Sequence, residues 1–547
     1  MEAASASAGR AVGGAFSAKR WSTVAAAAFG LGCVVYLVIC LVNLHTFIGH
    51  LYVNADVAVA AVIGELFGGR GPHAITYLGN HPWYATLLWE TATKGLPFHR
   101  QLWEAGPFFL QLLLCGLVAW GLWRLAGYQA ALYGGGFLLL LSTGALLWQL
   151  QPDSHSLAWF ADGLCGVAAL EIARQRGPRT GPKRVFVLAI GGCVTGFFLS
   201  PDSLALISGI APFLIATVLT SERQRKPALR RAAEVGTFLA ATFLVAEAVR
   251  HAMHTSGVEP TPFPPGETFV ALENLGHNIT LYYQALSSLL MGSFFGAKLT
   301  VETGIYPLAW LAGIYLLFLA VATARRSLMG ELGNGARGPA VPQRAAWIAF
   351  WLSSAALLSL SFLTGQAPTD LNSSRYLGGI PVAIAALYPL AQGRLGGVKA
   401  TAVAAATIWA VGANLNLLSN WIPESQALPY SLVNQVEALA AKNHAPVGYA
   451  NYWAASPITW GSNMKVLVLP IENCGPNLCQ YRIGSISSYY KPRPGVHSFL
   501  LDDPAAGPPP VSPPATLGPP TAEYHLGQTV IWIYPYDIGA KVSLASG

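Results

Sequence analysis

The chain has 547 residues, of which 53% are hydrophobic and only 10% are charged, and its mean hydropathy is +0.45. Soluble domains carry about 25% charged residues, so this composition excludes a soluble globular protein. The net charge of +7 is not gathered in one polar domain, which argues against a nucleic-acid partner. Because backbone polar groups in lipid must be hydrogen-bonded internally, we expect a bundle of membrane-spanning helices.

Eleven apolar segments are long enough to cross about 30 Å of hydrocarbon as helices. We expect these spans at 23–45, 106–127, 130–149, 156–173, 185–200, 203–220, 232–250, 303–323, 345–364, 376–392 and 398–417. With the N-terminus inside, the inside segments carry 20 Lys and Arg, and the outside loops between spans carry only five. This asymmetry follows the positive-inside rule and predicts an N-in, C-out orientation. Residues 1–21 are rich in small residues and are expected to be a disordered cytoplasmic tail.

The predicted membrane module, 22–418, has two long outside loops, and the first covers about residues 46–105. Within it, 56–67 has apolar residues at helical spacing and predicts a helix that begins at Asp56. The stretch 82–93 mixes aromatic residues with few charges, which favours a second helix in the headgroup zone. We therefore expect the first loop to form two short helices at the membrane surface.

The second long outside loop covers about residues 251–302, and 269–290 predicts another interfacial helix within it. From 419 to 547 the hydrophobicity drops, which predicts a small extracytoplasmic α/β domain able to hold its own core. Its expected elements are a helix at 432–442 and strands at 447–452, 465–471, 497–502 and 528–534. Cys474 and Cys479 lie close together in this domain, where an oxidising compartment favours a disulfide over a metal pair.

Asp56 is the first candidate for chemistry. It follows the first span by about a dozen residues and is expected on the outside face. An ionisable group at a membrane boundary is costly and tends to mark function. The alternative is that Asp56 only caps the loop helix, and the two roles are compatible.

Other acids have simpler expected roles. Asp202 is expected to cap the span that begins at 203, and Asp162 lies within a span where it could line a cavity. Glu234 and Glu247 are expected to pair with neighbouring arginines.

The loop layout resembles the GT-C superfamily of membrane glycosyltransferases. That superfamily includes lipid A aminoarabinose transferases, protein O-mannosyltransferases, oligosaccharyltransferases and mycobacterial arabinosyl- and mannosyltransferases. Its members have a catalytic acid just after the first span, a long first outside loop with two membrane-lying helices, a long fourth outside loop and often an outside C-terminal domain. Here Asn54-Ala55-Asp56 and the loops 46–105 and 251–302 carry the resemblance, which is architectural and extends over essentially the whole chain.

The resemblance implies an inverting enzyme that moves a hexosyl or pentosyl group from a polyprenyl-phosphate-linked donor. The acceptor would be a glycan, a lipid or a protein at the outer face of a bacterial inner membrane. Asp56 would be the general base that takes the proton of the acceptor hydroxyl. Arg375, Lys298 and Arg100 would hold the leaving phosphate, although Arg375 could instead be an interfacial anchor. The remaining candidate donors on this face are Arg70, Lys94, His81 and His99.

The candidates for binding the sugar or the acceptor are Asp153, His155, His81, Glu90 and Glu104. Alternatively, Asp153 caps the span that begins at 156, and the two glutamates are solvated loop acids. Oligosaccharyltransferases have an acidic metal-binding pair in the loop that here contains Asp153 and His155. Because this chain has Asp-x-His there, a divalent ion is not favoured, and no cofactor is expected.

Two functions from other classes stay open. One is a transporter or flippase of lipid-linked glycans, although the sequence lacks the inverted repeat typical of transporters. The other is a non-catalytic subunit of a cell-envelope glycan assembly, since a fold does not guarantee activity.

Overall fold

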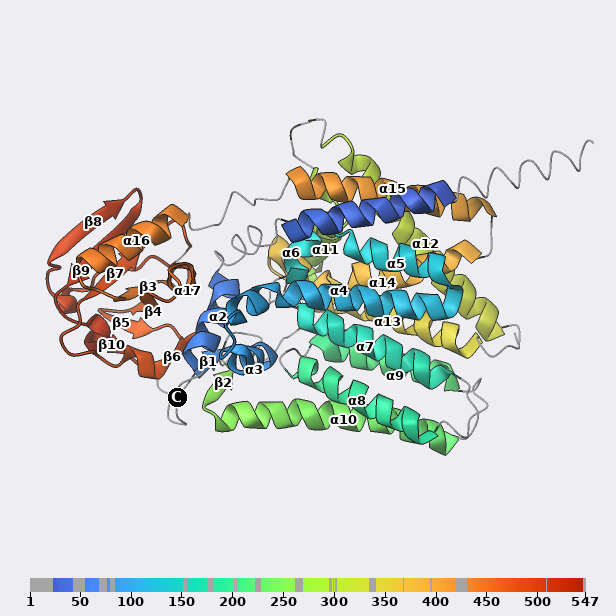
Figure 1. Ribbon diagram of the computed structural model, residues 1–547, viewed down its shortest axis with the longest axis horizontal. Coiled ribbons are helices and arrows are strands. Elements are labelled where there is room, and N and C mark those ends of the chain that lie inside the picture. The colour runs from blue at the N-terminus through green and yellow to red at the C-terminus, as the bar shows by residue number, and fades with distance from the viewer. Residues whose placement is uncertain are drawn as a thin grey trace, which may run out of the picture.

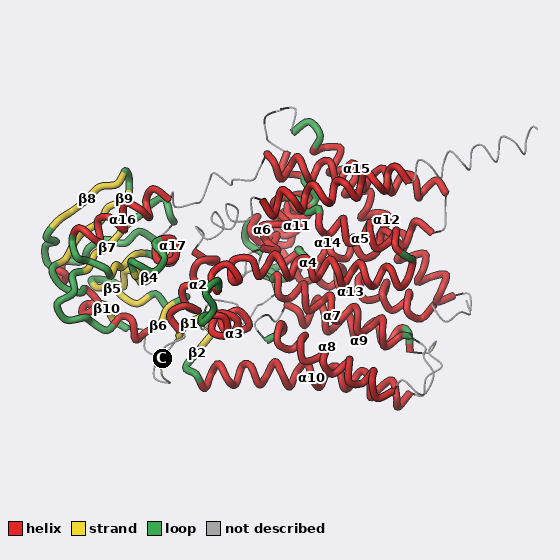
Figure 2. The backbone as a smooth tube through the Cα atoms, in the orientation of Figure 1, coloured by secondary structure: helices red, strands yellow, loops and turns green. Residues whose placement is uncertain are grey.

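The protein consists of a helical bundle and a separate sheet domain (Figures 1 and 2). The computed structural model describes residues 23–42, 55–67, 76–78, 84–150, 155–174, 181–200, 202, 204–221, 228–260, 269–294, 298, 300, 303–333, 341–366, 368–393, 396–419, 430–507 and 509–544. The predicted tail at 1–21 lies outside these residues. Helices of the first loop lie between the bundle and the C-terminal domain (Figure 1).

Eight helices of the described part of the chain are long and apolar enough to cross a membrane. They are Thr23–Val42, α4 (His99–Ala126), α7 (Ser156–Ala173), α8 (Gly181–Leu199), α10 (Ala228–Thr255), α12 (Tyr306–Gly333), α13 (Val341–Thr364) and α15 (Gly396–Ser419). Each coincides with a predicted span, so the polytopic helical class is confirmed.

The other three predicted spans, at 130–149, 203–220 and 376–392, are built from shorter pieces. These are α5 (Tyr128–Leu139) with α6 (Thr143–Leu150), the π-helical η2 (Leu206–Ile210) with α9 (Ala211–Leu219), and η6 (Leu371–Leu377) with α14 (Gly379–Leu387) and η7 (Tyr388–Gly393). Hydropathy registers the apolar length of such a segment, but it does not register a break in the helix.

The break between α5 and α6 shows how such an interruption is tolerated in an apolar bundle. The carbonyl oxygen of Leu140 accepts a hydrogen bond from Trp409 Nε1 at 2.8 Å, and that of Leu141 accepts one from the Tyr36 hydroxyl at 2.9 Å. Ser142 Oγ donates to the Leu289 carbonyl at 3.0 Å. Because freed backbone groups must find partners away from water, these side chains offset the cost of the break.

The C-terminal domain is an α/β unit around a seven-stranded sheet of order β10-β5-β4-β3-β7-β9-β8. Its strands are β3 (Val447–Ala450), β4 (Leu467–Cys474), β5 (Asn477–Gln480), β7 (Ser498–Asp502), β8 (Ala522–Leu526), β9 (Thr529–Tyr534) and β10 (Val542–Ser543). The central strand β3 is parallel to β4 and β7, and β7–β9, β8–β9 and β4–β5 are antiparallel. All four predicted strands and the predicted helix, α16 (Tyr430–Lys442), are present.

The predicted strand at 447–452 is two residues too long. Asn451 caps a helix instead, because its side chain accepts the Ala454 amide at 3.0 Å and opens α17 (Tyr452–Gly461). Together α16 and α17 cover one face of the sheet, where Val436 and Ile458 belong to one hydrophobic core. The opposite face has a core of its own around Tyr449.

The first loop forms the two predicted helices, α2 (Ala55–Phe67) and α3 (Tyr84–Thr93). The helix predicted at 269–290 in the second long loop is shorter than predicted, because Phe269 forms a β-bridge with Gly365 instead. It is α11 (Leu275–Leu289), preceded by the 3₁₀ turn η4 (Leu272–Asn274) and followed by η5 (Gly292–Phe294).

A small sheet ties three distant parts of the chain together. Its central strand β1 (Thr76–Leu78), from the first loop, is parallel to β2 (Val258–Pro260) of the second loop and antiparallel to β6 (Ser485–Ile486) of the C-terminal domain.

The C-terminal domain also packs directly on α2. Residues Ala58 to Ile63 of that helix are buried against α17 and α3. The Tyr489 hydroxyl donates to the Leu66 carbonyl at 3.3 Å. The domain is therefore part of the support of the first loop.

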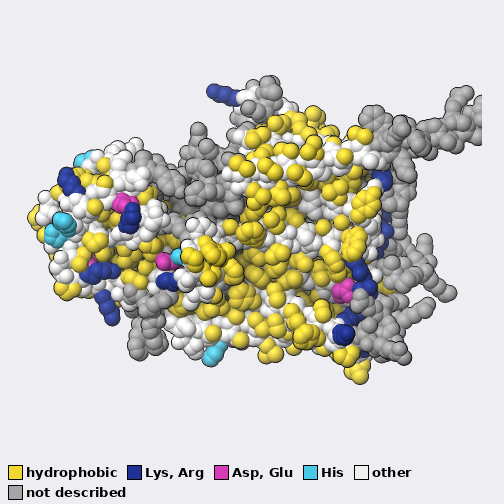
Figure 3. Space-filling view, in the orientation of Figure 1, with side chains coloured by type: hydrophobic (Ala, Val, Ile, Leu, Met, Phe, Trp, Pro, Cys, Tyr) yellow, Lys and Arg dark blue, Asp and Glu magenta, His cyan; other side chains and the backbone are white. Residues whose placement is uncertain are grey.

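The bundle surface is apolar over most of its length, and Lys and Arg gather at the end away from the C-terminal domain (Figure 3). This basic end is formed where α4 and α12 finish and where α8, α10 and α13 start, and it includes Arg124, Arg184, Arg230, Arg326 and Arg344. The opposite end faces the first loop, and we refer to it as the loop end.

Candidate functional site

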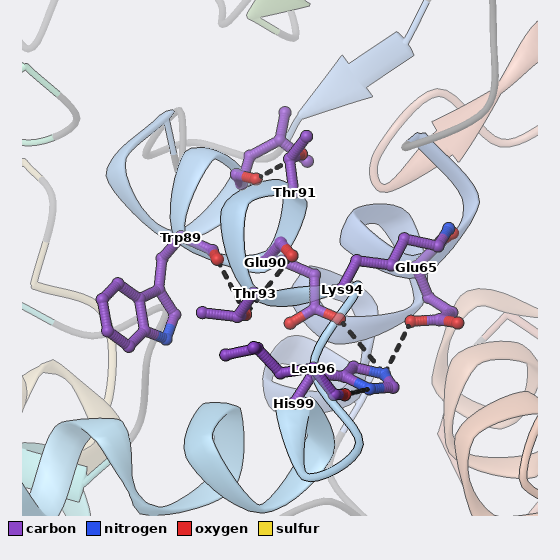
Figure 4. Close-up of polar contacts among 9 residues, drawn as sticks. Glu65, Trp89, Glu90, Thr91, Thr93, Lys94, Leu96 and His99 are labelled. Carbon is purple, nitrogen blue, oxygen red and sulfur yellow. Dashed lines mark hydrogen bonds and ion pairs between the residues drawn. The ribbon is translucent and has the colours of Figure 1, made fainter.

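Two carboxylates and an imidazole of the first loop form a compact cluster at the loop end (Figure 4). His99 Nε2 lies 3.2 Å from Glu65 Oε2 and 3.9 Å from Glu90 Oε1. One ligand atom from each of the three residues lies within 4.8 Å of the others. Glu65 comes from α2, Glu90 from α3 and His99 from the first residue of α4, so three helices must meet to form the cluster.

Local sequence brings α2 and α3 close enough for this contact. Leu87 and Glu90 are one helical turn apart on α3 and both are buried, and Glu90 packs against α2. At the crossing point stands Gly64, where a Cβ would lie 2.4 Å from Cγ of Glu90. A larger residue at 64 would push the two helices apart.

The environment of Glu90 opposes its ionisation. Its side chain is fully buried, and neither carboxylate oxygen has a hydrogen-bond partner among the described residues. Burial raises the pKa of Glu90 to about 8, and the adjacent Glu65 carboxylate raises it further, whereas the Lys94 ammonium lowers it. Lys94 is held beside Glu65 because its ammonium donates to the Glu65 carbonyl oxygen. The environment therefore favours the neutral, protonated form of Glu90.

This cluster can hold either a proton or a cation. His99 Nδ1 lies 3.2 Å from the Leu96 carbonyl, so a proton on Nδ1 is hydrogen-bonded there and Nε2 presents a lone pair to the carboxylates. Carboxylate oxygens and an imidazole nitrogen form a suitable ligand set for a divalent cation, and such a cation would lower the pKa of Glu90.

A second polar cluster lies at the start of α7. His155 Nδ1 is 2.6 Å from Asp202 Oδ2, and both side chains are buried. Asp202 Oδ1 also accepts the Leu204 amide at 2.9 Å, which confirms the predicted cap. The carboxylate thus holds the imidazole in one orientation.

Arg375 belongs to the same cluster. The ring of Tyr376 lies 4.9 Å from the ring of His155, and the Arg375 guanidinium lies 5.3 Å from the Tyr376 ring. Arg375 is half-buried in η6, whose first turn is capped by Asp370. A half-buried guanidinium can bind an anion, and an oriented imidazole can handle a proton.

Two of the predicted site residues, His155 and Arg375, thus each lie near the ring of Tyr376, and Glu90 is in the other cluster. Asp56 lies in the first turn of α2, but its side chain is outside the described part of the structure. The same holds for Arg100 and Glu104 in the first turns of α4. His81 and Asp153 also fall outside the described residues, and Lys298 is exposed in the segment before α12. Cys474 and Cys479 are joined by a disulfide.

Sequence reasoning missed Glu65, and it assigned Asp202 a capping role only. A signal for Glu65 was present, because it is an acid in an otherwise apolar helix of the loop that also contains Glu90 and His99. The link between Asp202 and His155 spans 47 residues, and no local pattern indicates it.

Asp162 is buried beside the π-helical turn η2, where Ser208 Oγ donates to it at 3.1 Å. Glu234 is paired with Arg184 and Arg230, and Glu247 with Arg250, as predicted.

The described architecture is that of a polytopic helical membrane protein with long loops at one end and an α/β domain packed on them. Comparison with solved structures finds a similarity to ArnT from Cupriavidus metallidurans in the apo state. The match covers 91% of this chain and 97% of that chain, with 13% sequence identity and a TM-score of 0.37. A similarity of this size assigns no activity to the chain. No protein-family model matches the chain, and no curated protein matches its sequence.

Proposed function

We propose that the protein is an inverting glycosyltransferase of GT-C type that takes a sugar from a polyprenyl-phosphate donor. The observation that carries this proposal is the placement of α2. This helix holds Asp56 in its first turn and packs between α3 and α17 at the loop end, where the Arg375 cluster also lies. A carboxylate on a supported helix and a guanidinium at the membrane boundary are the two groups that the reaction needs.

In the proposed reaction, Asp56 accepts the proton of the acceptor hydroxyl as that oxygen attacks the anomeric carbon. The bond from this carbon to the phosphate oxygen breaks at the same time, which inverts the configuration. Arg375 binds the phosphate as its charge grows, with Lys298 and Arg100 as further cations.

His155, held by Asp202, binds a sugar hydroxyl beside the phosphate, together with Asp153. Glu90 is buried and acts through its neighbours Glu65 and His99, which are partly exposed and orient the acceptor together with His81 and Glu104. The acceptor is a glycan, lipid or protein at the outer face of a bacterial inner membrane.

The test is sugar transfer from labelled polyprenyl-phosphate donors by the purified full-length protein in liposomes. We expect Asp56→Asn to lower kcat by about 10²–10⁴-fold, the range for removal of a general base. Arg375→Ala should lower kcat/KM for the donor by about 10²–10³-fold. Arg375→Lys should recover only part of that loss, because an ammonium cannot form two parallel hydrogen bonds to a phosphate.

A matched control is Glu247→Gln, which neutralises an exposed carboxylate on α10 and should leave transfer unchanged. Full activity of a folded Asp56→Asn protein would remove this residue from the mechanism. If wild type transfers no sugar from a broad donor panel yet moves lipid-linked glycan across the bilayer, the protein is a transporter instead.

A further inference from the structure

A cavity of about 190 Å³ opens at the basic end of the bundle, far along the helices from the clusters described above. It lies where the last turns of α12 meet the first turns of α13 and α15 and the end of η7. We propose that this cavity binds the phosphate headgroup of an anionic phospholipid in the leaflet at the basic end.

Among the described residues that line the cavity, the charged ones are Arg326 and Arg344, and none of these described residues carries a carboxylate. Arg344 is half-buried and donates from Nη2 to the Leu390 carbonyl at 3.0 Å, which fixes its position at the cavity wall. Arg326 is exposed at the rim, and Thr323 and Ser327 add hydroxyl groups. Two guanidinium groups and two hydroxyls form a suitable binding site for one phosphate group.

The remaining lining is apolar and faces lipid. Phe318 is 64% exposed, and Leu319, Ala322 and Val398 line the wall beside it. Because α12 is a membrane-crossing helix, the side on which Phe318 is exposed contacts acyl chains rather than water. An aqueous phosphate compound would leave this apolar wall uncovered, whereas a phospholipid would cover it with an acyl chain.

The position of the cavity selects the phospholipid over a polyprenyl phosphate. The proposed donor is used at the loop end, where Arg375 and His155 lie, whereas this cavity is at the opposite end. Basic pockets between transmembrane helices on the side rich in Lys and Arg are typical binding sites for acidic lipid headgroups.

The experiment is native mass spectrometry of the purified full-length protein, titrated separately with phosphatidylglycerol, with phosphatidylcholine of the same acyl chains and with a polyprenyl phosphate. Wild type should bind phosphatidylglycerol more tightly. Each cation near a lipid phosphate contributes about a fivefold affinity gain, so Arg326→Gln with Arg344→Gln should weaken phosphatidylglycerol binding by roughly thirtyfold. Arg325→Gln is the matched control, because Arg325 is exposed on the same helix but does not line the cavity.

Two further variants distinguish a specific loss of lipid binding from misfolding of the protein. Arg344→Lys keeps the charge and should bind phosphatidylglycerol within a few-fold of wild type. Ala322→Phe keeps both arginines but fills the cavity, and should weaken binding by about tenfold or more. Equal affinity of wild type and the double variant would overturn the proposal, as would unchanged binding in Ala322→Phe. Tighter, arginine-dependent binding of a polyprenyl phosphate would overturn the choice of lipid.

Discussion

Replacing Glu90 by Gln should remove a pH dependence from the stability of α3. The pKa of Glu90 is about 8 in the folded protein, against 4.5 for an unperturbed Glu. Between these two values the folded protein holds a proton that the unfolded segment has lost. The free energy of opening therefore falls as the pH rises from 4.5 towards 8, and the full loss is reached above pH 8.

The size of this effect follows from the pKa difference. Each pH unit inside the window changes the free energy of opening by about 1.4 kcal/mol, so the limit between pH 5.5 and pH 7.5 is about 2.7 kcal/mol. Because the folded carboxyl group itself begins to ionise as the pH approaches 8, we expect somewhat less than this limit, about 2 kcal/mol, which corresponds to a roughly thirtyfold change in the opening equilibrium.

The assay is amide hydrogen exchange of the α3 segment in chelator-treated protein at these two pH values, corrected for the intrinsic pH dependence of exchange. Wild-type protection of α3 should drop by roughly thirtyfold at the higher pH, and Glu90→Gln should show no such drop. Glu247→Gln, with an exposed carboxylate, should behave like wild type. Two results would refute the account of a buried, protonated carboxyl group. One is wild-type protection of α3 that does not change with pH, and the other is a Glu90→Gln protein whose protection depends on pH as in wild type.

Three more outcomes are expected. Gly64→Ala should lower α3 protection by an amount equivalent to about 1–3 kcal/mol through overpacking, whereas Gly116→Ala, whose Cβ would meet open space, should not. Gly484→Ala should expose α2 to proteolysis, because the new Cβ would collide with that helix. Gly475→Ala is the control, because Gly475 has a similar positive φ but its added Cβ would meet no other atom. Equal proteolysis of the two variants would mean that backbone strain, and not the contact with α2, causes the cleavage. Addition of Mn²⁺ or Zn²⁺ should make the protection of α3 less dependent on pH, since a bound cation keeps the Glu90 carboxylate ionised. If the pH dependence is unchanged, the cluster binds protons only.

Sequence patterns predicted those helices and strands that depend on residues close together in the chain. The long spans follow from apolar length, and the loop helix α2 follows from its apolar spacing after Asp56. The strands of the C-terminal domain follow from their alternating and β-branched residues. The helix α17 was not predicted, because Asn451 was assigned to the end of the preceding strand. In the structure its side chain caps the helix instead.

Contacts between distant residues were beyond such patterns. The break after α5 depends on Tyr36 and Trp409, which lie 105 and 269 residues away from the carbonyls that they satisfy. The Glu65–Glu90–His99 cluster depends on the close approach of two helices at Gly64, so its members looked like unrelated loop residues. Arg375 and His155 were each predicted from chemistry and position, but only the fold shows that Tyr376 joins them.

The strand β1 also fixes an order of events during synthesis. Thr76 pairs in antiparallel fashion with Ile486, which is made about 400 residues later. At typical elongation rates of about 5–20 residues per second, the first loop waits roughly 20–80 s for that partner. During this interval α2 lacks the cover of α17, and its buried apolar face is available to chaperones and proteases. Maturation of the loop end is therefore expected to be the last step in assembly, and pulse-labelled nascent chains should stay protease-sensitive at α2 until the C-terminal domain has been released.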